Sequence, residues 1–217
     1  MNIAISAIIG YLFGCINPAA IISKIKHMKL RDKGTGNLGA TNVTLVLGKR
    51  YGAVVMLFDI VKAFVSYHVA RAIFSTSVYA GMIAGAFAVV GHCFPFFLRF
   101  RGGKGLAAFG GFVLAYDPLT FLTLLAIALV LVIIVNYSFV VPYFGSIFFP
   151  VCVYLKSSDW ILCLIAALSG MLIMYKHFGN IIKAKESRDI KVRDFFKKVF
   201  KKKEQREIAS SMTEPKE

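Results

Sequence analysis

The chain has 217 residues, of which 58% are hydrophobic and only 17% are charged, whereas an ordinary soluble domain carries about 25% charged residues. This composition excludes an ordinary soluble domain and predicts an all-α polytopic membrane protein whose core is built from helices packed on helices. The net charge of +15 does not indicate nucleic acid binding, because the basic residues fall in short loops and a tail beside apolar segments. Anionic lipid headgroups and phosphate are the expected counter-ions.

Apolar segments follow one another along most of the chain. In chain order they cover residues 2–23, 51–71, 78–98, 105–116, 119–137, 142–156 and 160–176, which predicts about seven transmembrane helices, some of them short. The fourth and sixth are shorter than the ~17–25 residues of an ordinary span, so five spans with two re-entrant or interfacial pieces also fit. The first segment lacks the charged start and cleavage pattern of a signal peptide, and we expect it to be retained.

Lys and Arg are distributed unevenly between the two ends of these segments. With the N-terminus outside, the inner loops and tail (24–50, 99–104 and 176–217) hold all of the 26 Lys and Arg residues except Lys62, Arg71 and Lys156. The positive-inside rule therefore predicts an outer N-terminus and a cytoplasmic C-terminus. Residues 1–182 are expected to form the membrane bundle, and 183–217 a basic cytoplasmic tail that is partly disordered. The tail either lies on anionic lipid or is merely solvated.

The first inner loop combines three glycines with small polar side chains. Glycine allows tight or left-handed turns, so that successive N–H groups can converge on an anion, with hydroxyl and amide side chains as further donors. The residues expected to bind phosphate here are Thr35, Gly36, Asn37, Gly39, Thr41 and Asn42. If Thr41 or Asn42 caps the next helix, the positive end of that helix adds to the site. A plain flexible loop is the alternative. A dinucleotide site is excluded, because no βαβ pattern surrounds the glycines.

The second inner loop ends in Gly102-Gly103-Lys104-Gly105. Glycines beside a lysine would let a phosphate receive backbone donors and a point charge together. The loop is not a Walker motif, because Gly105 stands where Ser or Thr is required. The alternative, that basic residues simply end a span at the inner interface, accounts for Arg99 and Arg101 but not for the glycines.

Two further pairs of polar residues lie in or next to the spans. Asp59 and Lys62 are three residues apart inside the second span, where an ion pair on one helix face lowers the cost of burying charge. We expect a structural pair, with direct contact to substrate as the alternative. His177 and Asn180 lie one turn apart where the last span leaves the membrane, and can offer a titratable ring and an amide to a polar substrate. The alternative is an incidental interfacial histidine. No metal site is expected, because the four cysteines lack ligand spacing.

At these residues the chain resembles the bacterial acyl-phosphate:glycerol-3-phosphate acyltransferase family, often called PlsY. The resemblance runs from about Tyr11 to Ile182 and rests on four stretches, which are 36–42, Asp59 with Lys62, 91–105, and His177 with Asn180. It implies a small helical bundle in the bacterial cell membrane with its active site at the cytoplasmic face. Such a protein makes lysophosphatidic acid from an acyl phosphate and glycerol 3-phosphate, without a cofactor. The resemblance implies catalytic roles for Lys104, His177 and Asn180, and phosphate binding by the first loop together with Gly102 and Gly103.

The chain departs from the family pattern at several places. Thr35 replaces a serine, and Leu45 stands where the pattern has an arginine that leucine cannot replace as a phosphate ligand. The third inner loop, 136–142, lacks the Arg-Tyr-x-Ser run, and the Gly-Thr-Glu ending after Asn180 is absent. These departures leave open a non-catalytic paralogue that binds phosphate or lipid. A small transporter is less favoured, because the sequence shows no internal repeat.

Overall fold

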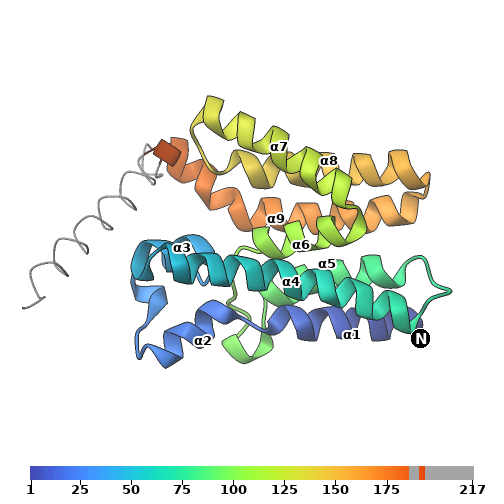
Figure 1. Cartoon of the computed structure of the whole chain (residues 1–217), viewed down its shortest axis with the longest axis horizontal. Coiled ribbons are helices and arrows are strands. Elements are labelled where there is room, and N and C mark those ends of the chain that lie inside the picture. The colour runs from blue at the N-terminus through green and yellow to red at the C-terminus, as the bar shows by residue number, and fades with distance from the viewer. Residues whose placement is uncertain (186–190, 194–217) are drawn as a thin grey trace, which may run out of the picture.

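The computed structural model describes residues 1–185 and 191–193, and within them the regular secondary structure is helical (Figure 1). The α-helices are α1 Asn2–Cys15, α2 Pro18–Ile25, α3 Ala40–Leu47, α4 Lys49–Ile73, α5 Ala80–Cys93, α6 Leu106–Tyr116, α7 Pro118–Val135, α8 Val140–Ser157 and α9 Trp160–Lys185. Two short 3-10 turns, η1 Leu30–Asp32 and η2 Phe96–Leu98, lie in the first and second inner loops. Most of the predicted basic tail lies outside the described residues.

Six stretches in the described residues are long and apolar enough to cross a membrane: Asn2–Ile25, Lys49–Ile73, Ala80–Leu98, Pro118–Val135, Val140–Ser157 and Trp160–Ile182. The sixth predicted segment, 142–156, is therefore part of a helix long enough to cross, because α8 extends beyond this apolar run at both ends. The fourth is α6, which has 11 residues and a length of about 16 Å, roughly half the hydrocarbon thickness. It is short because the chain before it, from Arg99 to Gly105, is a loop rather than helix.

The first apolar segment is broken, which the hydropathy pattern did not predict. Helix α1 ends at Cys15, and α2 begins at Pro18 with Asn17 as its N-cap. The Asn17 side-chain oxygen accepts a hydrogen bond from the Ala20 N–H at 2.8 Å, and proline is well suited to a first helical position. The break leaves the carbonyl of Ile16 free to accept a hydrogen bond from another helix.

Close backbone contacts between small residues hold the bundle together. Helix α1 packs on α5, where a Cβ added at Gly10 would lie 2.8 Å from Ala84 Cα and one at Gly14 would lie 2.8 Å from Ala88 Cα. Such small-xxx-small pairs let membrane helices approach closely. Helix α4 lies against α5 and α6, and α8 against α9. Phe112 and Phe149, whose ring centroids are 5.3 Å apart, lie in the shared core.

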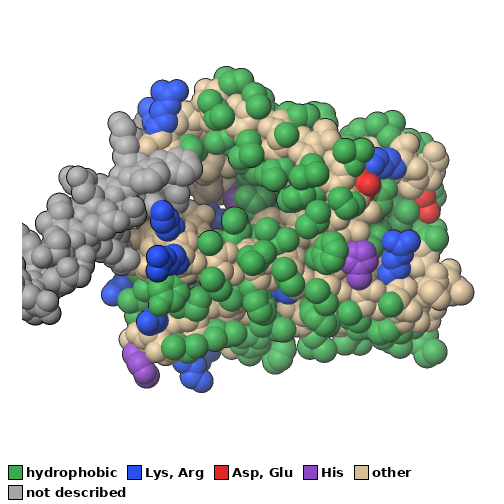
Figure 2. Space-filling view, viewed as in Figure 1, with side chains coloured by type: hydrophobic (Ala, Val, Ile, Leu, Met, Phe, Trp, Pro, Cys, Tyr) green, Lys and Arg blue, Asp and Glu red, His purple; other side chains and the backbone are tan. Residues whose placement is uncertain are grey.

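The two ends of the bundle differ in charge. The N-terminus lies at one end, and α3 and the last described turn of α9 lie at the other (Figure 1). Most of the Lys and Arg side chains visible in Figure 2 gather at this second end, whereas the middle of the visible face is largely hydrophobic. The loops singled out in the sequence therefore reach a common end of the molecule.

Candidate active site

Lys104 and Asn180 meet at the end of the bundle that carries the basic residues. Lys104 lies in the second inner loop, and Asn180 lies on α9, 76 residues further along the chain. The Lys104 ammonium donates a hydrogen bond to Asn180 Oδ1. Both side chains are half-buried. The structure thus brings together two residues that the sequence indicated separately.

His177 lies one turn before Asn180 on α9. Its ring is buried, and Nδ1 is 2.9 Å from the carbonyl oxygen of Ile173. Because a carbonyl oxygen can only accept, Nδ1 must carry the proton, and in the neutral ring Nε2 then holds the lone pair. Lys104 lies within electrostatic range of this ring. The arrangement therefore offers one cation, one amide and one unprotonated ring nitrogen in a small region.

The first inner loop is a tight turn held by one asparagine. Gly34 and Gly36 have left-handed backbone angles, with φ of +61° and +72°. Asn42 is buried, its Oδ1 accepts the Thr35 N–H at 2.6 Å, and its Nδ2 donates to the Leu30 carbonyl at 2.9 Å. Both ends of the Asn42 amide therefore contact the loop backbone, so this residue shapes the loop.

Helix α3 begins directly after this loop, and neither Thr41 nor Asn42 caps it. The N-cap is Gly39, with an extended φ of −152° and no side-chain hydrogen bond. Thr41 and Asn42 lie inside the first turn of the helix, which begins at Ala40, so neither supplies the cap that would have added to the site. Thr35 and Thr41 are exposed and Asn37 is half-buried.

The second inner loop contacts the first at Gly103. The N–H groups of Gly102 and Gly103 donate to the carbonyls of Cys93 and His92, at 3.0 and 3.2 Å. A Cβ added at Gly103 would overlap the His92 ring and would lie 2.8 Å from the Leu38 carbonyl oxygen. Only glycine fits this position, where the two loops and the end of α5 meet.

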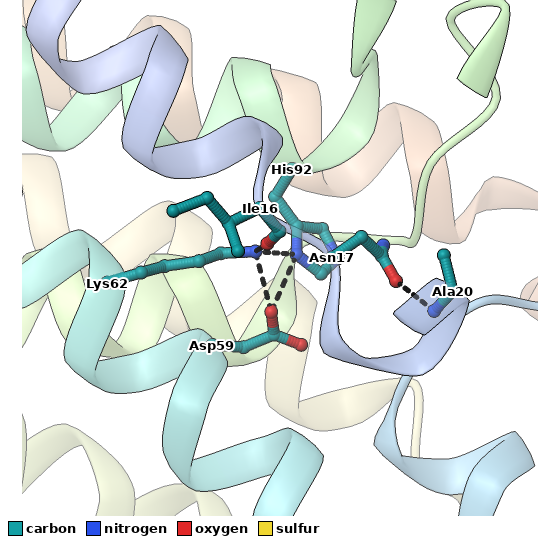
Figure 3. Close-up of polar contacts among 6 residues, drawn as sticks. All are labelled: Ile16, Asn17, Ala20, Asp59, Lys62 and His92. Carbon is teal, nitrogen blue, oxygen red and sulfur yellow. Dashed lines mark hydrogen bonds and ion pairs between the residues drawn. The ribbon is translucent and has the colours of Figure 1, made fainter. Parts of the chain in front are cut away.

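Three polar side chains are sealed beneath these loops. Asp59 Oδ1 and Lys62 Nζ are 2.6 Å apart, so the pairing expected from their spacing is present. His92 joins them from α5, with Nδ1 3.1 Å from Asp59 Oδ1 and 3.0 Å from Lys62 Nζ (Figure 3). The sequence reasoning missed His92 as part of the site. A polar residue at the end of an otherwise apolar span is the signal that could have found it.

Comparisons with known proteins identify a family. The family model described as glycerol-3-phosphate acyltransferase matches residues 4–187. The chain belongs to this glycerol-3-phosphate acyltransferase family. A glycerol-3-phosphate acyltransferase of Listeria monocytogenes serotype 4a is 34% identical over 196 residues, covering 89% of this chain and 98% of the relative. The enzyme of the same name from Thermosipho melanesiensis is 33% identical over 199 residues, covering 91% and 98%.

Two solved structures of the family have the same fold as this chain. They are crystal structures of PlsY (YgiH), an integral membrane glycerol 3-phosphate acyltransferase. Its glycerol 3-phosphate form is 31% identical with a TM-score of 0.81, covering 88% of this chain and 96% of that one. Its lysophosphatidic acid form is 29% identical with a TM-score of 0.80, covering 90% and 99%. The all-helical membrane architecture expected from the sequence is therefore that of the glycerol-3-phosphate acyltransferase family.

Leu45, where the family resemblance leads us to expect an arginine, lies on α3 one turn after Thr41. Its side chain is half-buried. The nearest basic residues along the chain, Lys49 and Arg50, begin α4 and are exposed. In this member of the glycerol-3-phosphate acyltransferase family, the first turns of α3 therefore present a hydroxyl and a leucine instead of a guanidinium.

Proposed function

We propose that the chain transfers an acyl group from an acyl phosphate to the 1-hydroxyl of glycerol 3-phosphate, and thereby makes lysophosphatidic acid for phospholipid synthesis. The observation that carries the proposal is the contact between Lys104 and Asn180, one helical turn from the buried ring of His177. Family membership supports it, because the relatives are glycerol-3-phosphate acyltransferases. The acyl phosphate donor is our inference from the resemblance and from the phosphate chemistry of the site.

The protein does not have to activate the acyl donor, because an acyl phosphate is already activated. The glycerol hydroxyl oxygen attacks the acyl carbonyl carbon, the bond from that carbon to the phosphate oxygen breaks, and inorganic phosphate leaves. Lys104 would stabilise charge on the phosphate, and Asn180 would orient the lysine. The hydroxyl proton passes either to His177 Nε2 or to the departing phosphate. A covalent enzyme intermediate is not required.

We propose that the first inner loop binds phosphate through its backbone and its exposed hydroxyls. The N–H groups of Thr35 and Gly36 already donate to Asn42 Oδ1 and to the Lys33 carbonyl. The left-handed turn at Gly36 therefore offers the N–H groups that follow it in the chain to an anion. Thr35 and Thr41 are the exposed hydroxyl donors on this loop and on the first turn of α3. Asn42 holds the loop in shape rather than contacting the phosphate, because both ends of its amide are engaged with the loop backbone.

We also propose that this end of the bundle faces the cytoplasm of a bacterial cell and contacts anionic lipid headgroups. The uneven distribution of Lys and Arg supports this orientation. It places the site where a water-soluble glycerol phosphate and a membrane-embedded acyl chain can meet.

The test uses the purified protein with labelled glycerol 3-phosphate. Palmitoyl phosphate, palmitoyl-CoA and palmitoyl carrier protein are supplied separately, and lysophosphatidic acid is measured. Product from palmitoyl phosphate alone is the expected result. If lysophosphatidic acid forms only from palmitoyl-CoA or only from palmitoyl carrier protein, the inference that the donor is an acyl phosphate is wrong.

A second candidate function is phosphate or lipid binding without catalysis. Leucine at position 45, where an arginine is expected, favours this candidate. In the same experiment it predicts no product from any donor, together with saturable binding of labelled glycerol 3-phosphate.

A further inference from the structure

The buried cluster of Asp59, Lys62 and His92 is more than an ion pair hidden in the membrane. Their exposed fractions are 1%, 3% and 2%, so the cluster cannot contact a substrate in this conformation. A charge buried at such depth is costly unless it is paired and hydrogen-bonded. The question is therefore what these three residues hold in place.

The cluster joins the helices on one side of the site. Lys62 of α4 donates to the carbonyl of Ile16 at 2.7 Å, at the break between α1 and α2. Its other neighbours are Asp59 Oδ1 at 2.6 Å and His92 Nδ1 at 3.0 Å. An ammonium has three N–H donors, of which two point to the Ile16 carbonyl and to Asp59 Oδ1. His92 Nδ1 either accepts the third from Lys62 or, when it carries the proton, donates to Asp59 Oδ1. Helices α1, α4 and α5 are thus fixed to one another at the level of the His92 ring (Figure 3).

The opposite edge of the His92 ring supports the second inner loop. The ring's Nε2 lies so close to Gly103 that a Cβ there would overlap it. The backbone of His92 also accepts the Gly103 N–H at 3.2 Å. A movement of this ring toward the loop would therefore displace Gly103, and Lys104 is the next residue.

We propose that His92 is a positioning residue that connects the buried pair to Lys104. The Asp59–Lys62 pair anchors its Nδ1 side through a hydrogen bond with one of the two partners, and its Nε2 side fixes the position of the Gly103 backbone, so that Lys104 reaches Asn180. His92 acts through Lys104 and does not contact the reacting atoms. The role of Lys104 in binding phosphate rests on the proposed function. The support of Gly103 by His92 does not depend on that function.

Two substitutions test the contacts at the two edges of the His92 ring separately. His92→Asn keeps a polar atom near the Nδ1 position but removes the edge beneath Gly103. His92→Phe keeps a ring beneath Gly103 but removes the anchor to Asp59 and Lys62. His68→Gln is the matched control, because His68 is a histidine on α4 that contacts Phe64 rather than a loop.

The first readout is amide hydrogen exchange of a peptide that contains Gly102 and Gly103, which needs no activity. We expect faster exchange of these two amides in both His92 variants, with unchanged exchange in α7 and α8 and in the His68→Gln control. The second readout is acyl transfer, where both variants should lose about 10- to 100-fold in kcat/KM, as is common when the support of an oriented group is removed.

Wild-type exchange at Gly102 and Gly103 in either folded His92 variant would overturn the proposal. If a His92 variant fails to fold, Asp59→Asn combined with Lys62→Met removes both charges together and leaves no unpaired charge, and the same exchange readout applies. Its control is Asp117→Asn combined with Lys156→Met, another ion pair between helices, which should leave loop exchange unchanged. Loss of loop protection without any acyl transfer by the wild type would support His92 as a positioning residue while refuting the proposed function.

Discussion

Replacing Lys104 by alanine tests the site most directly. The ammonium is the cation that donates to Asn180 Oδ1, and the neighbouring backbone at Gly103 is fixed by a hydrogen bond to His92. The substitution removes a positioned charge and leaves Asn180 without this donor. Removing one preorganised donor to developing charge typically costs about 2.7–4 kcal/mol, which is a loss of about 10²- to 10³-fold in kcat.

The assay is transfer from palmitoyl phosphate to labelled glycerol 3-phosphate by protein purified in detergent. Thermal unfolding is measured in parallel, and we expect only a small change, because Lys104 is half-buried rather than part of the core. Arg99→Ala is the matched control. Arg99 is exposed on the same loop, and its removal should cost less than about tenfold. A folded Lys104→Ala variant with activity within about threefold of the wild type would refute the assignment of Lys104 to phosphate.

Three further predictions concern the first inner loop, the Asp117–Lys156 ion pair and Leu45. Gly36→Val should reduce kcat/KM at least about tenfold, because φ at Gly36 is +72° and a β-branched residue adopts that angle at a cost of about 1–3 kcal/mol. Gly39→Val is the control in the same assay and should reduce kcat/KM less, because φ at Gly39 is an extended −152°. The hydrogen bond from Lys156 lowers the pKa of Asp117 to about 2, below the ~3.9 of an unfolded chain. The carboxylate therefore adds stability above about pH 4 that is lost as the pH falls from about 4 to 2. Asp117→Asn should lower Tm by about 1–4 °C at neutral pH and by less at about pH 2, where the carboxyl is about half protonated. An equal effect at both pH values would contradict the ion pair. Leu45→Arg should lower KM for glycerol 3-phosphate about tenfold if the rest of the site is intact, and an unchanged KM would mean that no phosphate contact is missing there.

Several features of this protein could be read from the sequence, because they depend on neighbours along one helix or on the solvent. The membrane spans follow from apolar length, since a helix in lipid needs a fixed number of apolar residues. The Asp59–Lys62 pair follows from a spacing of three residues on one helix face. The break at Asn17 and Pro18 was also present in the sequence as a capping residue before a proline, but the hydropathy of the surrounding segment concealed it.

Only the tertiary structure decided which residues meet. Lys104 and Asn180 are 76 residues apart, and Asp59 and His92 are 33 apart, so no local period relates them. Their contacts depend on how far each helix is rotated and how closely the backbones approach, and this is set by side-chain packing such as that of Gly10 and Gly14 against α5. Many rotations of an apolar helix satisfy the lipid equally well, because lipid does not distinguish one apolar face from another. The helix contacts therefore choose the rotation, and with it the members of the site.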